Sequence, residues 1–324
     1  MNRVGFCDIE VGYDVHVVGD LAYSTNNDGL MIINVSNPRV PVKIGEALIG
    51  GSFGFVVENN IAYIASVING FTIVNISDPV DPDVLCQSTT EVGITRITVS
   101  GSLAYASYYN GGLKIFNISD PSTPIFLGEY SSTRSDAVEI KDNYVYLANA
   151  EVGLKVINVS NPNIPELITS ISQTGGGNDI YISEEILFLA CWGSGIRVID
   201  ISNPTAPQML DSYDDNDGGE ELGLIEKDDL LYVADNYGVE LFNVSNPNSI
   251  VEITQRTSDV IAAHDIDVDE DYIYVAQGGG LLILEVSTIS DNTTPNILPY
   301  IIIISIVAVA AGISILIYFR FIKK

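Results

Sequence analysis

Short runs of alternating apolar and polar residues, separated by turn residues, recur along most of the chain. Asn-Asn, Asn-Gly and Ser-Asp-Pro sequences stand between the runs and are typical of tight turns. A period of two in runs of this length predicts β-strands and excludes a solenoid of paired helices. The four runs of one unit are Phe53–Glu58, Ile61–Ser66, Phe71–Ser77 and Val84–Ser88.

The strand pattern itself repeats every 41 to 43 residues. Six units carry the segment first met at Leu30–Pro38, Leu-Met-Ile-Ile-Asn-Val-Ser-Asn-Pro, and a truncated copy at Leu281–Ser287 ends the series; an Ala-Tyr-like strand lies upstream of each. Such a period with four strands per unit is typical of a propeller blade, so the sequence predicts an all-β, seven-bladed β-propeller. Measured at the position of Asn34, the copies fall at residues 34, 75, 117, 158, 200, 243 and 285.

The two ends of the repeat region complement each other. The last unit stops after its third strand at Ser287, whereas Arg3–Ile9 matches the fourth-strand pattern of Val42–Ala47. We therefore expect residues 3–9 to pair beside the strand around Leu281–Ser287 and to complete blade seven, so that no sheet edge stays open. The predicted propeller domain spans residues 1–287.

The Leu-x-Val-Ile-Asn/Asp-Val-Ser segment, followed by Asn-Pro and preceded by an Ala-Tyr-Val-Ala-like strand, resembles the LVIVD repeat family of propellers. The resemblance covers residues 3–287 and is legible in all seven copies. It implies the propeller fold and, for many members, a surface protein without an assigned reaction. Because a propeller is a scaffold, the function has to be inferred from its loops.

A different pattern follows the repeats. Residues 288–297 are a short polar linker, and the 22 residues from Leu298 to Phe319 carry no charge. This length spans the hydrocarbon core of a bilayer, so we expect one transmembrane helix over 298–319, in contact with lipid. Residues 320–324 form a basic tail.

Sidedness follows from the charges next to the apolar segment. Positive residues favour the cytoplasmic side, which predicts a single-pass cell-membrane protein with an extracellular propeller and a cytoplasmic C-terminus. Export requires a leader, and none precedes the first strand, so either a leader is missing from this sequence or the chain is tail-anchored with a cytoplasmic propeller. Six Asn-x-Ser/Thr sequons fit an exported glycoprotein, but closure of a turn explains five of them equally well. They are at Asn34, Asn75, Asn117, Asn158, Asn243 and Asn292.

Strand parity predicts which face of the propeller lies next to the bilayer. The third strand of blade seven ends on the face that carries the Ser-Asn-Pro turns, opposite the rim where each first strand begins. With so short a linker, we expect that face to lie next to the membrane and the rim to point away from it.

The chain is strongly acidic, with 42 Asp and Glu residues against 14 Lys and Arg and a net charge of −28. Such a surface repels nucleic acid, which we therefore exclude as a partner. Three cysteines, Cys7, Cys86 and Cys191, are too scattered for a zinc site or a disulfide framework, and we expect them to be buried.

The resemblance to propellers implies that the first strand of each blade lines a central channel. Asp14, Asp179 and Asp265 occupy equivalent positions there, together with Arg96. Carboxylate oxygens suit a hard cation such as calcium, so these residues are a candidate metal site; the alternative is a set of hydrated carboxylates, one of them neutralised by Arg96. The acidic stretch 214–221 lacks the residue order of a calcium loop and reads as a solvated turn. The first ring of channel residues is Asp14, Gly54, Arg96, Ala137, Asp179, Gly223 and Asp265, and the second is His16, Val56, Thr98, Glu139, Tyr181, Ile225 and Asp267.

Aromatic residues are expected on the rim, where side chains of this type hold sugars and peptides, although packing between blades is the other common role. We therefore expect a surface display, adhesion or ligand-binding module whose partner is a protein, peptide or glycan, with no cofactor beyond a divalent cation. The candidate rim residues are Phe53, Tyr108, Tyr109, Trp192 and Tyr237.

Catalysis is the alternative function. A hydrolase or lyase would use a histidine–aspartate pair at the channel mouth, and His264-Asp265 is the best candidate for general acid–base work. No recognisable motif places a nucleophile beside it, so no enzyme activity is expected.

Overall fold

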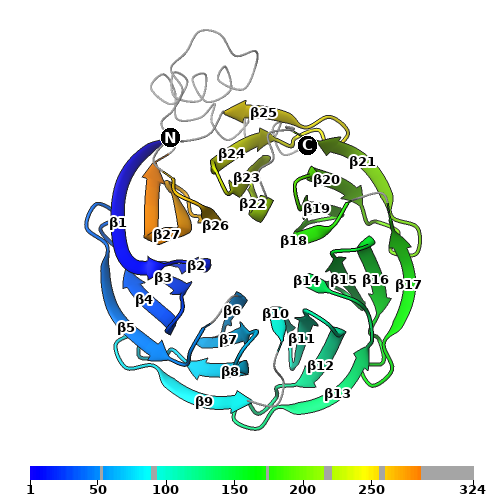
Figure 1. Cartoon of the computed structure of the whole chain (residues 1–324), viewed down its shortest axis with the longest axis horizontal. Helices are drawn as coiled ribbons and strands as arrows, with labels where there is room; N and C mark the ends of the chain where they lie inside the picture. Colours follow the sequence, from blue (N-terminus) through cyan, green and yellow to red (C-terminus); the bar gives the residue numbers. More distant parts are fainter. Residues whose placement is uncertain (52–53, 89–92, 173–174, 215–220, 255–259, 286–324) are drawn as a thin grey trace, which may run out of the picture. The chain divides into compact units, whose positions relative to one another are not determined.

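Seven β-sheets are arranged in a ring around a central channel (Figure 1). The computed structural model describes residues 1–51, 54–88, 93–172, 175–214, 221–254 and 260–285. Each blade is an antiparallel sheet whose first strand faces the channel and whose fourth strand lies at the perimeter. The predicted all-β, seven-bladed propeller is therefore confirmed.

Blades one to three follow the expected strand order. Their strands are β2 (Asp14–Val18), β3 (Leu21–Thr25), β4 (Gly29–Asn34) and β5 (Val42–Leu48); β6 (Gly54–Glu58), β7 (Ile61–Ser66), β8 (Gly70–Asn75) and β9 (Asp83–Ser88); and β10 (Ile94–Ser100), β11 (Leu103–Tyr108), β12 (Gly112–Asn117) and β13 (Ile125–Tyr130).

Blades four to six repeat this order. Their strands are β14 (Ser135–Lys141), β15 (Tyr144–Asn149), β16 (Gly153–Asn158) and β17 (Glu166–Ile171); β18 (Gly177–Ser183), β19 (Ile186–Cys191), β20 (Gly195–Asp200) and β21 (Gln208–Tyr213); and β22 (Glu221–Lys227), β23 (Leu230–Asp235), β24 (Gly238–Asn243) and β25 (Val251–Thr254).

Blade seven is built from both ends of the repeat region. The first half of β27 (Tyr272–Glu285) pairs with β26 (Ala263–Val268), and its second half pairs with β1 (Asn2–Val11). Cys7 lies opposite Leu281, and Asn2 lies opposite Glu285. The predicted closure by the N-terminal strand is confirmed, with a strand longer than the expected residues 3–9.

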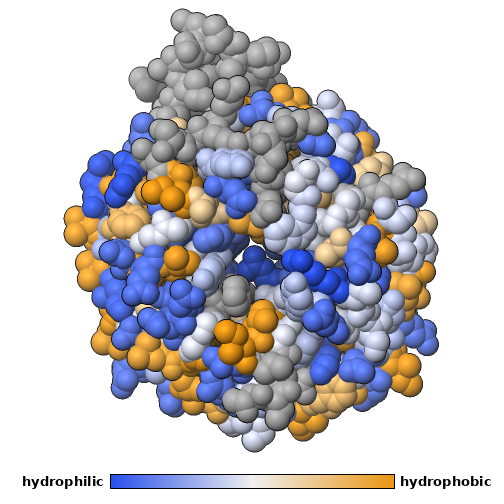
Figure 2. All heavy atoms as spheres, in the orientation of Figure 1, coloured by the Kyte–Doolittle hydropathy of each residue, from blue (hydrophilic) through white to orange (hydrophobic). Residues whose placement is uncertain are grey.

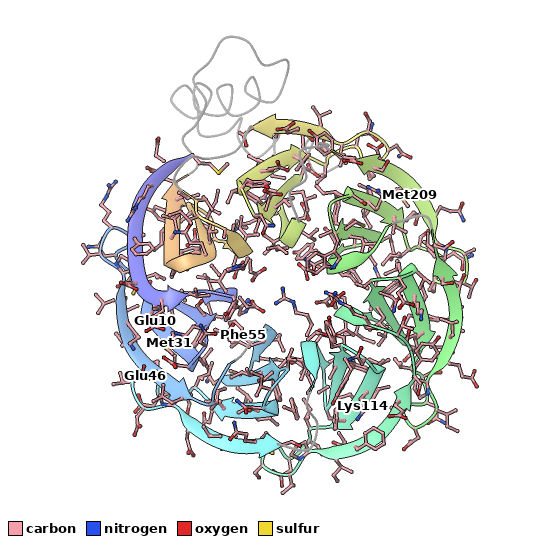
Figure 3. The ribbon with its side chains drawn as sticks, viewed as in Figure 1. Glu10, Met31, Glu46, Phe55, Lys114 and Met209 are labelled. Carbon is pink, nitrogen blue, oxygen red and sulfur yellow. The ribbon has the colours of Figure 1, made fainter. Side chains whose placement is uncertain are left out.

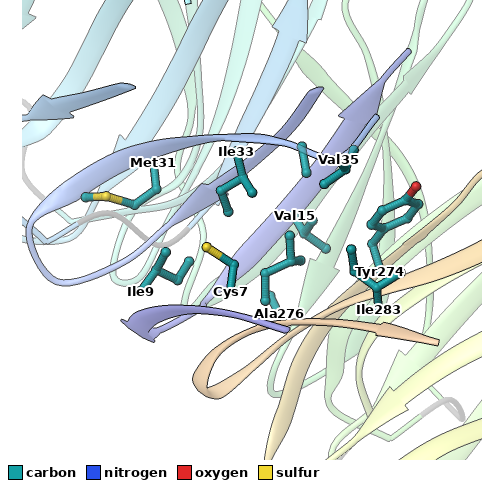
Figure 4. Packing of buried hydrophobic residues seen from close by; sticks show 11 residues of the cluster. Cys7, Ile9, Val15, Met31, Ile33, Val35, Tyr274, Ala276 and Ile283 are labelled. Carbon is teal, nitrogen blue, oxygen red and sulfur yellow. The ribbon is translucent and has the colours of Figure 1, made fainter. Parts of the chain in front are cut away.

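Seven hydrophobic clusters fill the seven contacts between neighbouring blades. The cluster between blades seven and one joins Cys7 of β1 and Ile283 of β27 to Val15 and Ile33 of blade one (Figure 4). The aromatic residue of each Ala-Tyr strand is buried in such a cluster, as Tyr146 is between blades four and five. Cys7 and Cys191 are buried as expected, whereas Cys86 is half-buried beside the cluster of blades two and three.

The asparagine of the repeated Asn-Val-Ser segment closes a turn. Asn34 Oδ1 accepts hydrogen bonds from the Ser36 N–H at 3.0 Å and the Ser36 hydroxyl at 2.6 Å. Asp200 accepts the equivalent bond from the Ser202 N–H at 2.8 Å, although aspartate makes no sequon. Turn closure is thus a sufficient reason for five of the six sequons, and the sixth, at Asn292, lies outside the described residues.

Three of the Asn-Pro loops, with Asp78-Pro79 as the equivalent loop of blade two, rest on a glycine in the outer strand of the preceding blade. A Cβ atom on Gly45 of β5 would overlap the Pro79 carbonyl oxygen, and a Cβ atom on Gly128 of β13 would lie 2.6 Å from the Pro162 carbonyl oxygen. Glycine at these positions lets the loop backbone approach the sheet, which explains why the repeat combines both features.

The described residues contain no helix that is long and apolar enough to cross a membrane. Residues 298–319, for which the transmembrane helix is predicted, lie outside them, as do the linker and the basic tail. The end of β27 at Glu285 pairs with Asn2, close to where Gly5 meets the Pro38 loop, so the third strand of blade seven ends on the Ser-Asn-Pro face as predicted.

Substitution of Gly45 by alanine tests the packing of the Asn-Pro loops. The new methyl group would force the Pro79 loop away from β5, and we expect a loss of about 1–3 kcal/mol in the free energy of unfolding. Chemical denaturation measures this loss. Gly51→Ala is the matched control, because the nearest atom to its Cβ would be 3.8 Å away; equal stability of the two variants would contradict the proposed role of the loop contact.

Candidate functional site

The first strands of the seven blades surround a cavity of about 360 Å³ in the central channel. Every residue of the two predicted rings that has a side chain lines this cavity, which confirms the predicted register. Figure 2 shows hydrophilic residues in the hollow at the centre of the propeller, whereas Glu46 and Met209 lie on the outer strands β5 and β21 (Figure 3).

Two glycines in the first ring make room for longer side chains of the next blade. A Cβ atom on Gly54 would lie 2.6 Å from Cδ of Arg96, and one on Gly223 would overlap the carboxylate of Asp265. The four charged side chains of the ring therefore share the channel with two glycines and one alanine.

Arg96 is the cation at the centre of the first ring. Its Nη1 atom lies 2.5 Å from Asp14 Oδ2, and its Nε atom lies 4.0 Å from Asp179 Oδ1. Burial alone would lower the pKa of Arg96, but the Asp14, Asp179 and Asp265 carboxylates outweigh burial and raise it. The guanidinium thus stays charged and compensates the acids around it.

Asp14 and Asp265 are both buried in the first ring and line the same cavity. Burial raises the pKa of both carboxyl groups; Arg96 lowers that of Asp14, whereas the charge of Asp14 raises that of Asp265 further. Ionisation of both carboxyl groups at once therefore carries an electrostatic cost.

The channel aspartates also join neighbouring blades. Each accepts a hydrogen bond from a backbone N–H of the first strand of the next blade, so a side chain of one sheet bonds the backbone of another. Asp265 and Asp267 make this bond across the closure from blade seven to blade one. The four bonds are from Phe55 N to Asp14 Oδ2 at 3.1 Å, Leu224 N to Asp179 Oδ2 at 3.1 Å, Val15 N to Asp265 Oδ2 at 3.0 Å, and Val17 N to Asp267 Oδ2 at 2.6 Å.

The geometry does not support the metal site predicted at Asp14, Asp179 and Asp265. The described residues contain no group of three His, Cys, Asp or Glu side chains that could hold a metal ion. The cation that these aspartates face is Arg96, and their oxygens are engaged with it and with backbone N–H groups. Most of the acidic stretch 214–221 lies outside the described residues.

The second ring holds further acids below the first. Burial, and then the charge of Asp179, raise the pKa of Glu139 to about 8. Burial likewise raises the pKa of Asp179 to about 7, against the opposing charge of Arg96. His16 lies 3.5 Å from Asp267 and partly offsets the burial that raises the pKa of that carboxyl.

The structure separates the predicted rim aromatics. Tyr109 and Tyr237 are exposed and Trp192 is half-buried, but Tyr108 is buried between blades two and three, with Lys114 Nζ 4.7 Å from its ring centroid. Its side chain follows the inward alternation of β11, so the prediction that it faces a ligand on the open rim is wrong. Phe53 lies outside the described residues.

Tyr109 and Trp192 meet at a second pocket, of about 460 Å³, at the mouth of the channel. The guanidinium carbon of Arg134 lies 4.8 Å from the Tyr109 ring centroid and 5.1 Å from the Trp192 ring centroid. Arg134 Nε donates a hydrogen bond to Asp136 Oδ1 at 2.8 Å. Burial raises the pKa of Asp136, and its bonds to Arg134 work in the opposite direction. We call this cavity, which residues of all seven blades line at the mouth of the channel, the rim pocket.

Arg134 and Asp136 were not among the residues singled out from the sequence. They lie in and next to the loop that enters β14, and the repeat directs these entry loops to the rim. The register of the repeat could therefore have placed them near Tyr109 and Trp192, but it could not show that one guanidinium lies between both rings.

His264 also lines the rim pocket, but it is not paired with Asp265. Its Nδ1 atom lies 2.7 Å from the Gly12 carbonyl oxygen, and its ring lies against Tyr13 with the centroids 5.5 Å apart. Asp265 points instead to Asp14 and the Val15 N–H. The geometry does not include the histidine–aspartate pair suggested for general acid–base catalysis.

The buried channel acids predict that stability falls as the pH rises. Because burial raises the folded-state pKa of Glu139 to about 8 and that of Asp179 to about 7, the folded chain binds protons that the unfolded chain releases. This contribution is complete below the ordinary pKa of a carboxyl group and is lost as the pH passes through the folded-state values. Water reaching the 15% exposed Asp179 reduces the effect.

We expect the melting temperature to fall by roughly 2–5 °C between about pH 5 and about pH 9. Differential scanning calorimetry measures it. The Glu139→Gln variant, which resembles the protonated side chain, should show a shallower decline, whereas Glu46→Gln on the exposed outer strand serves as control. A decline unchanged in Glu139→Gln would contradict this assignment.

The fold is shared with many solved propellers at low sequence identity. The β-propeller domain of Myceliophteria thermophila Cps50 (Swd1) matches with a TM-score of 0.73 and 11% identity, covering 88% of this chain and 99% of that domain. The WD40 β-propeller domain of Doa1 matches with a TM-score of 0.69 and 11% identity, covering 89% and 97%. A protein from Lactobacillus plantarum matches with a TM-score of 0.68 and 14% identity, covering 82% and 87%. At these identities the likeness concerns the fold alone.

No curated protein sequence matches this chain. The LVIVD repeat family matches six segments that together make up more than half of it; blade six, formed by β22 to β25, falls between two of the matches. The matched residues are 12–47, 50–90, 94–132, 134–172, 174–215 and 262–298. The repeat therefore identifies this seven-bladed propeller as a member of the LVIVD repeat family.

Proposed function

We propose that the chain is a membrane-anchored binding protein whose propeller presents the rim pocket to a soluble or surface-bound ligand. The observation that carries this proposal is the Arg134 guanidinium held between the rings of Tyr109 and Trp192 over a cavity of about 460 Å³. Concave pockets with aromatic walls and a few fixed polar groups are the usual form of a ligand site. A glycan or a peptide segment would fit these features.

The contacts of the channel acids favour binding over catalysis. A general acid or base has to reach the reacting group, whereas Asp14 and Asp265 are occupied by Arg96, by each other and by backbone N–H groups. His264 is engaged by the Gly12 carbonyl. Turnover of a substrate that depends on His264 would favour the hydrolase or lyase alternative.

The proposed anchoring of the chain in a membrane rests on the sequence of its C-terminal segment. The uncharged segment 298–319 is long enough to span a bilayer, and the basic residues after it favour a cytoplasmic C-terminus with the propeller outside the cell. Since β27 ends on the Ser-Asn-Pro face, the rim pocket opens on the opposite face of the propeller. This arrangement would leave the pocket accessible to ligands from outside.

Ligand binding can be measured through Trp192, the only tryptophan of the chain. A ligand in the rim pocket should change its fluorescence, and Tyr109→Ala should weaken binding about tenfold or more because one wall of the pocket is lost. Tyr237→Ala is the control, since Tyr237 is an exposed rim aromatic that does not line this pocket. Arrays of glycans and peptides provide the probes. Equal losses in both variants would contradict the assignment to this pocket.

Anchoring can be tested by cell fractionation. We expect the full chain in the membrane fraction and resistant to alkaline extraction, and a chain truncated after residue 290 in the soluble fraction. A full chain that is released by alkaline buffer would refute the transmembrane assignment, and protease accessibility in intact cells would decide on which side the propeller lies.

A further inference from the structure

The rim pocket contains a guanidinium whose orientation is already fixed. Arg134 lies over the rings of Tyr109 and Trp192, and Asp136 holds it through Nε. A side chain held in this way loses little further conformational entropy when a ligand binds.

The hydrogen-bonding capacity of Arg134 is mostly unused. Among the described residues, no hydrogen bond or ion pair involves its two Nη atoms. The other arginines of the described channel and rim use an Nη atom within the protein. Arg96 Nη1 contacts Asp14, and Arg197 Nη1 donates to the Ser194 carbonyl oxygen at 2.5 Å. The planar fork of N–H groups on a guanidinium matches the two oxygens of a carboxylate.

The charge of the pocket lining differs from that of the chain as a whole. In the part of the chain that the structure describes, Arg96 and Arg134 line the pocket with Asp136 as the only acid, although the net charge of the chain is −28. Asp136 is 7% exposed and is engaged with Arg134, whereas the Arg134 side chain is 34% exposed. The channel carboxylates compensate the charge of Arg96, so Arg134 is the cation of the pocket that is left for an anionic ligand. Acids farther away than about 8–10 Å are screened by salt.

Two polar atoms at the base of the pocket lack a hydrogen-bond partner. They are Nε1 of Trp192 and Oδ2 of Asp136, both buried. The indole lies close enough to Asp136 to help lower the pKa of that carboxyl, but the two atoms do not form a bond of ordinary geometry. A hydroxyl group can accept from an N–H and donate to a carboxylate, so it would satisfy both atoms.

From these features we infer that the rim pocket binds a carboxylate-bearing sugar, such as a uronic acid residue of a glycan, with its carboxylate on the Nη fork of Arg134. The ring of the sugar lies against Trp192 or Tyr109, and one hydroxyl reaches the Trp192 N–H and the Asp136 carboxylate. The cavity of about 460 Å³ accommodates one such residue. This inference rests on the proposed function of the rim pocket and specifies its ligand.

The test titrates the full chain, in a mild detergent, with three probes and follows Trp192 fluorescence and binding heat. Glucuronate should bind at least about tenfold more tightly than glucose, which has the same ring without the charge, and more tightly than benzoate, which has the charge without the hydroxyls. Equal affinity for glucose and glucuronate, or tighter binding of benzoate, would overturn the inference.

Variants connect the preference to Arg134. Arg134→Gln should abolish the preference for glucuronate over glucose. Arg134→Lys keeps the charge but loses the planar fork of N–H groups, so most of the preference should be lost. Arg197→Gln is the matched control and should retain the preference. Asp136→Asn keeps an acceptor oxygen for Arg134 Nε and should retain the preference for glucuronate over glucose, even if both sugars bind more weakly; loss of that preference would refute the inference. A glycan or peptide that changes Trp192 fluorescence equally in the wild type and in Arg134→Gln would keep the pocket as a binding site and overturn only the acidic-sugar assignment.

Discussion

Pairing of β1 with β27 is the contact on which the ring depends. A propeller blade buries its faces only against neighbouring blades, so each of the seven interfaces needs both of its partners. The strand formed by the first residues of the chain supplies the outer edge of blade seven, and its Cys7 and Ile9 enter the cluster shared with blade one. Without this pairing, one sheet edge and one hydrophobic interface would be open to solvent.

Two further sets of contacts strengthen the interfaces between blades, one near the perimeter of the ring and one along the central channel. Near the perimeter, the Asn-Pro loop of one blade rests on a glycine of the preceding outer strand, as Pro79 does on Gly45. Along the channel, aspartates such as Asp265 bond the backbone of the next blade. The hydrophobic clusters lie between these two layers, so close backbone packing covers the apolar interface near the perimeter and hydrogen bonds cover it along the channel.

The cost of the inner layer is the burial of several acids in one channel. Arg96 compensates part of this negative charge. Protonation compensates another part, because burial raises the pKa values of Glu139 and Asp179. The channel acids therefore make their contacts with other residues of the propeller itself. The rim pocket above it keeps a partly exposed guanidinium, which makes the rim the better place for recognition.

The sequence by itself determined the number of blades, the closing role of the N-terminal strand and the register of the channel rings. These features depend on local alternation and on a fixed period, both of which are readable along one chain. The burial of Tyr108, the approach of Arg96 to Asp14, and the position of Arg134 beside Tyr109 and Trp192 were decided by the tertiary structure. Each of these depends on distances between residues of different blades, which the period of the repeat does not contain. The metal site predicted at Asp14, Asp179 and Asp265 depends on the same kind of distance, since only the folded ring brings Arg96 next to these carboxylates.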